Sequence, residues 1–259
     1  MSFALSNHQL VLPDFSIITI HHGSGEKDDP LLSSLASLIN QQSVKSEELL
    51  EHLGGESFLW NKISKEIQLS EHASHYTLRL LEEKNITAHE GFARALARVR
   101  GNIVGFLQPG EEYLPGALIA VEKYFQAHRE VDLLLAGAIV EDEAAGKTFS
   151  YAPQVFSLEY FWTVRPRIIA STLFGRASLF TKDFLLDPTY GELMLEEWLL
   201  RVLQAGKRMA PLHFNTTRTR GSSLKKQEDR PLPSPPTWMK LLLPWWKFCS
   251  FYQTQFKKK

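Results

Sequence analysis

The sequence predicts an α/β protein built on an open, mostly parallel central sheet flanked by helices, with a basic, aromatic appendage at its C-terminal end. Short, β-branched apolar segments alternate with segments whose apolar residues recur at helical spacing. This alternation is typical of a parallel sheet with right-handed crossovers. A length of 259 residues suits one large domain of this kind.

The first elements establish the alternation. FSIITI at 15–20 predicts a buried strand, because it is short, apolar and rich in β-branched residues. A stretch with two glycines and Pro30 then predicts a turn. Apolar residues in 31–42 recur at helical spacing and predict an amphipathic helix.

The later elements continue the pattern. Residues 47–70 are ambiguous, because they suit a helix followed by a strand but are interrupted by Gly54 and Gly55. Further strands are expected at 76–81, 103–107, 131–140 and 168–173, and further helices at 87–99, 115–128 and 193–205. Open parallel sheets bind ligands at the carboxyl ends of their strands, which here are residues 21–25, 108–112 and 141–143.

Composition argues against several classes of protein. Lys plus Arg and Asp plus Glu each number 29, and this zero net charge argues against a general nucleic-acid binder. The single cysteine, Cys249, excludes an intramolecular disulfide framework and favours a reducing, cytoplasmic compartment. No apolar run reaches the roughly 18 residues that predict a transmembrane helix. The first residues also lack the pattern of a signal peptide.

The charge is unevenly distributed along the chain. Residues 218–259 contain ten Lys or Arg against two acidic residues, a net charge of +8. The proline-rich stretch at 230–236 predicts a boundary between a domain at 1–226 and a tail at 227–259. In the tail, tryptophans and phenylalanines interleave with lysines, which suits a segment on a membrane surface. The alternative is a C-terminal helix packed on the domain. Interleaved aromatic and basic residues can also bind single-stranded nucleic acid, but no other feature of the sequence supports that function.

Several segments resemble the family 2 glycosyltransferases, in the right order and at familiar spacing. The run GFARALARVRGNIVGFLQPGEEYLPGAL at 91–118 matches the family's central stretch at Gly101, at the strand 103–107, at Pro115 and at Leu118. FSIITI is similar to the family's opening strand, and the helix ending LINQQ is similar to its S-L-x-x-Q helix. LEEWLLRVLQAG at 195–206 is similar to the acidic helix, and TRTRGSS at 217–223 is similar to the R-x-H-x-x-S segment. The resemblance covers about 15–226 and implies a GT-A fold and a nucleotide-sugar donor.

The chain departs from this family at the metal-binding motif. The D-x-D position reads Gln108-Pro109-Gly110 and is followed by Glu111. The histidine of R-x-H is replaced by Arg220, and the family's acidic residue at the end of the second strand is not recognisable. The resemblance therefore supports the fold more strongly than the activity.

Glu111 is the candidate metal ligand. A divalent cation stabilises the charge that develops on a leaving diphosphate, and Mg²⁺ and Mn²⁺ prefer oxygen ligands. Because a single carboxylate holds such an ion only with help from phosphates, Mg²⁺ or Mn²⁺ is expected only with bound nucleotide. The alternative is a solvated acidic turn ahead of a helix.

The implied substrate-binding residues are Thr19, Ile20, His21, Arg94, Gln108, Gly110, Arg218 and Arg220. Guanidinium groups suit phosphate oxygens, and the resemblance places Arg220 close to the diphosphate, although an ordinary basic loop is the alternative. The strand end at 19–23 is expected to cradle the nucleobase mostly through backbone groups. The adjacent His21 and His22 lack the spacing of a zinc helix.

Glu196 and Glu197 are the candidate catalytic bases. A transferase that inverts the sugar needs a group that takes the proton of the acceptor hydroxyl. Counting back from Arg201 favours Glu197, and a short gap favours Glu196. The alternative places both on a solvated helix face, paired with Arg201.

The expected function is transfer of a sugar from a nucleotide-diphosphate donor to a glycan or lipid-linked acceptor, in surface polysaccharide biosynthesis at the inner face of the cytoplasmic membrane. The main alternative is a degenerate GT-A module that binds a nucleotide or a protein partner without turnover. An unrelated α/β fold with a membrane-binding tail is the third hypothesis.

Overall fold

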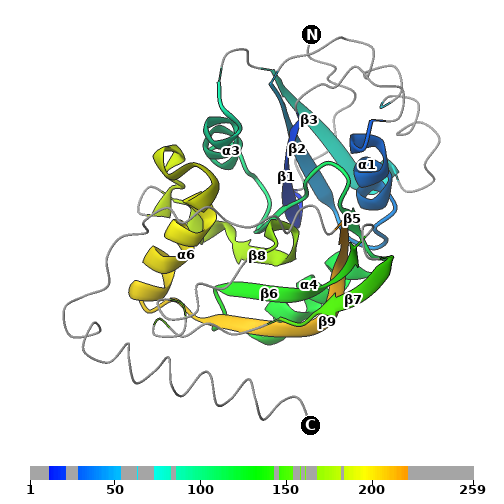
Figure 1. The fold of residues 1–259 in the computed structure, drawn as a ribbon. Coiled ribbons are helices and arrows are strands. Elements are labelled where there is room, and N and C mark those ends of the chain that lie inside the picture. The colour runs from blue at the N-terminus through cyan, green and yellow to red at the C-terminus, as the bar shows by residue number, and fades with distance from the viewer. Residues whose placement is uncertain are drawn as a thin grey trace.

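A single twisted sheet organises the protein (Figure 1). The computed structural model describes residues 12–21, 29–53, 63, 73–82, 86–142, 146–153, 158, 161, 168–181 and 184–220. Within these ranges the sheet has nine strands: β1 (Phe15–His21), β2 (Ser46–His52), β3 (Tyr76–Glu82), β4 (Ile103–Phe106), β5 (Glu112–Tyr113), β6 (Leu133–Asp142), β7 (Lys147–Tyr151), β8 (Leu173–Arg176) and β9 (Met209–Arg220). Their order is β3-β2-β1-β4-β8-β6-β9-β5, with β7 paired to β6.

The main strands share one direction. β3, β2, β1 and β4 are parallel neighbours, and β6 is parallel to β9. β8 is antiparallel to both β4 and β6, so β6 and β9 run in the same direction as β1 and β4. The expected mostly parallel sheet is therefore confirmed, and its main strands present their carboxyl ends at one edge, the carboxyl edge.

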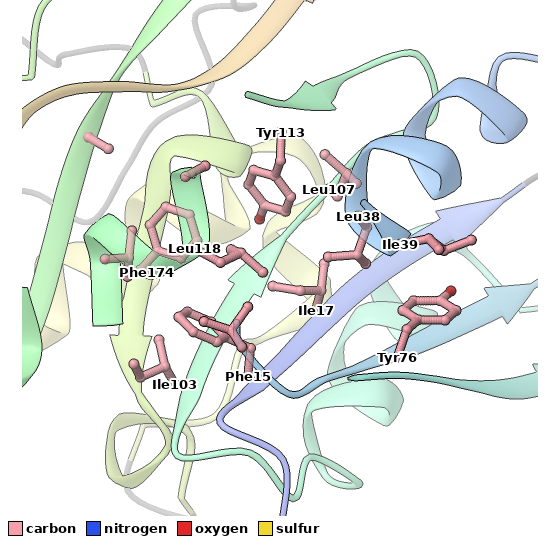
Figure 2. Close-up of a cluster of buried hydrophobic side chains, with 14 of the residues drawn as sticks. Phe15, Ile17, Leu38, Ile39, Tyr76, Ile103, Leu107, Tyr113, Leu118 and Phe174 are labelled. Atoms are coloured by element: carbon pink, nitrogen blue, oxygen red, sulfur yellow. The ribbon is translucent and has the colours of Figure 1, made fainter. Parts of the chain in front are cut away.

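Helices cover both faces of the sheet (Figure 1). α1 (Leu31–Ile39) and α4 (Ala117–Ala127) pack on one face, whereas α3 (Ala88–Leu96) and α6 (Met194–Gln204) pack on the other. Short 3-10 turns occur at Ala73–His75, Ala170–Thr172, Ala177–Phe180 and Pro188–Leu193. Figure 2 shows the core under α1 and α4, with the labelled residues Phe15, Ile17, Leu38, Ile39, Tyr76, Ile103, Leu107, Tyr113, Leu118 and Phe174.

Three expectations for strands need correction. The ambiguous region at 47–70 begins with a strand, β2, and not with a helix. Its acidic residues are buried, and Glu47 and Glu48 accept hydrogen bonds from Ser16 and Thr19 of β1, so these residues do not mark a solvated helix face. The strand expected at 168–173 begins only at Leu173, because Thr172 bonds back to Ile169 in a tight turn. β9 was not expected to be a strand at all.

Gly101 lies where the chain before β4 touches β1. A Cβ atom at this position would lie 2.5 Å from the main-chain atoms of Phe15 and Ser16. The Gly101 amide donates to Ser16 Oγ at 2.8 Å, and that hydroxyl donates to Glu47 Oε1 at 2.5 Å. Close backbone approach therefore requires a glycine at this position.

Polar side chains of α1, together with Gln41 just after it, hold the segment 108–118, which contains β5 and the start of α4. Ser34 Oγ accepts from the Gly110 amide at 2.9 Å, Ser37 Oγ accepts from Tyr113 at 3.0 Å, and Gln41 Oε1 accepts from Leu118 at 3.2 Å. Gln41 also donates to the Leu114 carbonyl at 3.1 Å. Ser37 and Gln41 are the polar residues of the S-L-x-x-Q pattern, so the motif satisfies main-chain groups that no strand pairs.

Two further predictions concern the chain's relation to membranes. No helix in the described ranges combines the length and the apolar character that crossing a bilayer requires. The proposed tail at 227–259 and its boundary lie outside the described residues.

Candidate functional site

The carboxyl edge collects most of the residues predicted from sequence. Thr19, Ile20 and His21 end β1, Gln108 to Glu111 follow β4, and Arg218 and Arg220 end β9. Because these three strands run in the same direction, their ends meet at this edge. Arg94 and the two candidate bases belong to the helices α3 and α6 on one face of the sheet.

The loop after β4 is fixed by the start of α1. The Gly110 amide donates to Ser34 Oγ and to the Pro30 carbonyl at 3.1 Å, and the Ser34 hydroxyl lies 3.2 Å from the Gln108 carbonyl. Gly110 has φ +88°, a conformation that L side chains rarely adopt. A glycine therefore occupies a position of the D-x-D motif where the backbone geometry disfavours an aspartate.

Glu111 is buried and internally bonded. Its Oε1 accepts a hydrogen bond from Thr219 Oγ1 of β9 at 3.0 Å, and its Oε2 accepts one from the main-chain N–H of Gln108 at 3.2 Å. Burial raises the pKa of Glu111, and both hydrogen bonds oppose that rise. The carboxyl group thus ties the loop after β4 to β9.

These residues do not fit a resident divalent cation. Mg²⁺ and Mn²⁺ need several oxygen ligands, whereas Gln108 offers only an amide, Gly110 has no side chain and Glu111 already accepts two hydrogen bonds. Across the part of the chain that the structure describes, no three His, Cys, Asp or Glu side chains are grouped to hold a metal ion.

The two arginines of β9 have different surroundings. Arg218 lies between two carboxylates, 3.6 Å from Glu112 on β5 and 3.2 Å from Glu141 on β6. Arg220, the last residue of β9, is exposed and is paired in register with Glu141. Along the strand both alternate with the buried Thr217 and Thr219, so they face away from Glu111.

The end of β1 offers main-chain groups to a ligand. The Thr19 side chain is buried and donates to Glu48 Oε1 at 2.6 Å, so its hydroxyl is already engaged. The pairing between β1 and β4 ends at Ile18 and Phe106. The main-chain N–H and C=O of Ile20 point to the same side of β1 as those of Ile18 and lie past the last paired residues. Whether the segment binds a ligand through its backbone stays a prediction.

Beneath Thr19 lies a buried polar group that the sequence did not reveal. Glu48 accepts hydrogen bonds from Thr19 and from the Tyr76 hydroxyl. Burial raises the pKa of Glu48 to about 7, although both hydrogen bonds oppose the rise. Burial and the neighbouring Glu48 also raise the pKa of Tyr76 well above its ordinary value.

His21 joins two residues that the sequence did not identify. Its Nε2 lies 2.9 Å from Asp29 Oδ2, and its Nδ1 lies 3.2 Å from Nδ1 of His52, its register partner on β2. Asp29 Oδ1 in turn accepts from the Leu31 amide at the start of α1, at 2.9 Å. All three side chains are buried, so this cluster connects β1, β2 and α1 at the carboxyl edge.

Glu51 is a further residue that sequence reasoning missed. It is the last acidic residue of β2, it is buried against Gly91 of α3, and neither of its carboxylate oxygens has a hydrogen-bond partner. The Arg94 guanidinium lies 3.8 Å away. Burial raises the pKa of Glu51, and Arg94 and Arg98 oppose the rise. An acidic residue at the carboxyl end of a parallel strand was the available signal, but β2 itself was not predicted.

The candidate bases differ in their contacts on α6. Both oxygens of Glu197 accept from the Arg201 guanidinium, at 2.7 Å and 2.9 Å, and Arg201 also donates to the Leu185 carbonyl. Glu197 therefore takes part in a brace that fixes the first turn of α6. Glu196 is also largely buried, but adjacent residues of a helix point in different directions.

The sheet and the loops at its carboxyl edge define a GT-A fold, the fold of nucleotide-sugar-dependent glycosyltransferases, as the sequence resemblance predicted. The most informative similar structures are of two proteins. TarS 1–349 of S. aureus in complex with UDP-GlcNAc has a TM-score of 0.60 and 16% identity, over 86% of this chain and 62% of that one. The mannosyltransferase PcManGT from Pyrobaculum calidifontis, in complex with GDP-Man and Mn²⁺, has a TM-score of 0.57 and 13% identity, over 81% of this chain and 57% of that one.

The extent of these matches limits what they establish. The chain spans less than two thirds of the length of either structure, and it covers 38% of the longer TarS structure. No family model and no curated protein sequence matches the chain. The comparisons therefore establish the fold.

Proposed function

We propose that the protein is a glycosyltransferase that moves a sugar from a nucleoside-diphosphate donor to the hydroxyl of a glycan or lipid-linked acceptor. The observation that carries this proposal is the GT-A fold with polar groups of β1, β4 and β9 gathered at one carboxyl edge. Ligands of open α/β sheets bind at this edge. Support also comes from two similar structures that contain UDP-GlcNAc and GDP-Man.

The nucleobase end of the donor is assigned to the ends of β1 and β2. The main-chain groups of Ile20 lie beyond the pairing with β4. Glu51 supplies a buried carboxylate that accepts no hydrogen bond within the described residues, and such a group is costly unless a ligand donates one. A base with a ring N–H would compensate it by donating a hydrogen bond, and the Arg94 guanidinium, 3.8 Å away, favours the charged form of the carboxylate.

Arg220 is assigned to the diphosphate end. Its guanidinium is always charged and suits phosphate oxygens, and its strand ends at the same edge as β4. Arg218 of the same strand contacts Glu112 and Glu141, which offset its charge. In this proposal Gln108 and Gly110 contribute loop shape and main-chain groups, and Glu111 holds the loop against β9.

Binding of a donor sugar tests the proposal directly. UDP-, GDP-, CMP- and TDP-sugars are screened by thermal shift, and at least one is expected to raise the unfolding temperature, because a ligand that binds only the folded state stabilises it. Because Glu111 is already bonded, the shift is expected to survive EDTA. Calorimetry with Arg220→Ala is expected to show affinity about tenfold or more below wild type, since a charged hydrogen bond is worth roughly 1.5–3 kcal/mol.

Arg100→Ala is the matched control for that variant. Arg100 is also exposed, but it precedes β4 and so lies at the opposite edge of the sheet. It is expected to bind the donor like wild type. Equal affinities for Arg220→Ala and wild type would remove Arg220 from the site, and the absence of any shift with every donor would overturn the proposal.

A second function is favoured by a specific observation. The D-x-D positions hold Gln108 and Gly110, and Glu111 is engaged in hydrogen bonds, which suits a module that binds a nucleotide or a protein partner without turnover. Transfer from a labelled donor to soluble glycans and to membrane-extracted lipids distinguishes the two functions. Binding without any product would favour the second one.

Location and pathway belong to the same proposal. The basic, aromatic residues at 238–259 suit attachment to the cytoplasmic membrane surface, where lipid-linked acceptors of surface polysaccharides are found. Product that forms only on membrane-extracted lipids would support this assignment, whereas transfer only to soluble glycans would contradict it.

A further inference from the structure

The edge of the sheet opposite the proposed donor site, the amino edge, is rich in basic residues. It consists of the segments that precede the parallel strands, together with Arg176 at the end of the antiparallel β8. In the described part of the chain these segments are 12–14, 40–45, 73–75, 97–102, 128–132 and 205–208. Together with Arg176 they contain three acidic residues and seven lysines or arginines: Lys45, Arg98, Arg100, Arg129, Arg176, Lys207 and Arg208.

This excess of positive charge is not a general property of the domain. The whole chain has zero net charge and residues 218–259 carry +8, which leaves −8 for residues 1–217. A domain that is acidic overall therefore has one basic edge. Such a separation of charge orients a protein toward an anionic partner.

The segments of the amino edge form one continuous row. Main-chain hydrogen bonds connect them: the Asp14 N–H donates to the Lys45 carbonyl at 2.8 Å, and the Asp132 N–H donates to the Arg208 carbonyl at 2.9 Å. The Arg176 N–H in turn donates to the Asp132 carbonyl at 3.0 Å. The start of β4 fills the remaining gap, because β4 lies between β1 and β8 in the sheet. The basic residues therefore share one surface.

Three of the seven cations have internal partners. Arg176 donates to main-chain carbonyls at the end of α4, Arg98 donates to a carbonyl of α3, and Lys207 lies 3.9 Å from an aspartate. Such groups stabilise helix ends, where carbonyls lack partners. The other four are exposed, and their side chains form no hydrogen bond or ion pair with a described residue: Lys45, Arg100, Arg129 and Arg208. These four charges are available to a partner.

Two exposed leucines lie at the same edge. Leu12 is 59% exposed and lies just before β1. Leu185 is 42% exposed, and its carbonyl accepts a hydrogen bond from Arg201 in the last turn of α6, the helix that ends at the amino edge. Apolar side chains beside basic ones suit a membrane surface, because leucine enters the acyl boundary while lysine and arginine meet the phosphates. Anionic lipid therefore fits this edge better than a soluble anion.

We propose that the amino edge lies on the headgroups of anionic phospholipids, so that the carboxyl edge and its donor site face away from the membrane. The exposed cations attract the lipid phosphates, and Leu12 and Leu185 enter the interface. This inference goes beyond the proposed function, because it assigns a face and an orientation to the domain. It also differs from attachment through the tail alone, which would leave the orientation of the domain undefined.

Vesicle sedimentation tests the role of the charges. The full chain is expected to bind phosphatidylcholine vesicles with about 30% phosphatidylglycerol far more strongly than pure phosphatidylcholine vesicles. Salt at about 0.5 M is expected to release it, because ions screen these charges. R100Q/R129Q/R208Q is expected to lower the partition coefficient about 100-fold, since each basic residue near an anionic surface contributes about fivefold. Equal binding to both kinds of vesicle would overturn the proposal.

Lys147→Gln is the matched control for Arg129→Gln. Both residues are exposed, but Lys147 begins β7 opposite Asp142, at the carboxyl edge. Arg129→Gln is expected to bind the anionic vesicles about fivefold more weakly than wild type, and Lys147→Gln like wild type. Equal losses in the two variants would show that only total charge matters, and would remove the amino edge as the docking face.

Site-specific fluorescence tests the orientation without altering the charges. Cys249 is the single cysteine, so Cys249→Ser is the background for Leu12→Cys, Leu185→Cys and Phe149→Cys, each labelled with the polarity-sensitive fluorophore NBD. Anionic vesicles are expected to increase the emission at 12 and 185 and to shift it to the blue. The label at 149 is the matched control, because Phe149 is 46% exposed on β7 near the carboxyl edge, and its emission is expected to stay unchanged.

Two results of the fluorescence experiment would overturn the proposal. Unchanged emission at 12 and 185, in protein that sediments with the vesicles, would show that the tail or another face makes the attachment. A blue shift at 149 alone would show that the carboxyl edge faces the lipid. Because neither experiment contains a nucleotide, failure of this inference leaves the proposed function standing, and failure of donor binding leaves this inference standing.

Discussion

Glu196→Gln is expected to lower the rate of sugar transfer by roughly 10²–10⁴-fold and to leave donor affinity nearly unchanged, if Glu196 is the base that deprotonates the acceptor hydroxyl. A base acts on the acceptor proton in the transition state, so its loss reduces kcat and not ground-state binding. Arg201 engages both oxygens of Glu197, so the two candidate bases are compared directly in matched variants. Transfer kinetics at saturating donor, with calorimetry of donor binding, measure the two effects separately.

Glu197→Gln is the matched control for that variant. It removes one side of the brace with Arg201 and is expected to lower the free energy of unfolding while folded protein keeps most of its turnover. The opposite outcome, with lost turnover in Glu197→Gln and normal turnover in Glu196→Gln, would assign the base to Glu197. Normal turnover in both variants would remove the base from this helix.

Glu48→Gln is expected to remove much of the pH dependence of stability between pH 5 and 8. The pKa of Glu48 rises from its ordinary 4.5 to about 7 in the folded protein. Below pH 4.5 the group is protonated in both the folded and the unfolded state, so its burial as a charge does not lower the free energy of unfolding. Between pH 4.5 and 7 only the folded state keeps the proton, so stability falls as pH rises. Above pH 7 the free energy of unfolding stays lower by the full amount, about 3 kcal/mol.

Urea unfolding at pH 5.0 and pH 8.0 measures this effect. Wild type is expected to lose stability toward pH 8, whereas Glu48→Gln is expected to be less stable than wild type at pH 5 and equal or more stable at pH 8. Glu130→Gln, at a solvent-exposed glutamate, is the matched control and is expected to follow wild type. A Glu48→Gln variant with the same difference between the two pH values as wild type would show that Glu48 is ionised in the folded protein.

Sequence patterns predicted the fold where local and tertiary preferences agree. β1 and β4 are short, apolar and fully buried, so their composition alone indicates strands. β2 was not predicted, because Glu47, Glu48 and Glu51 are buried in it, and their burial depends on partners far along the chain. β9 contains Pro211, and its register with β6 is irregular around Gly137. Both features obscure the pattern of a strand in the sequence.

The site was predictable in part for the same reason. Residues that follow a recognisable strand or motif, such as His21, Gln108 and Glu111, were identified from sequence. Asp29, His52 and Glu51 acquire their surroundings only when β2 lies beside β1, and no spacing in the sequence shows that pairing. The engagement of Glu197 with Arg201 could be anticipated from their separation of four residues, and it now favours a bracing role.

The polar side chains of α1 and Gln41 affect how the segment 108–118 opens locally. Loops usually exchange their amide hydrogens quickly, because they open alone. Here the amides of Gly110 and Tyr113 donate to Ser34 and Ser37 of α1, and the amide of Leu118 donates to Gln41 just after that helix, so the segment cannot expose them without losing these contacts. Hydrogen-exchange mass spectrometry is expected to show 108–118 protected and exchanging together with α1. Exchange of this segment well before the helix would show that the two open independently.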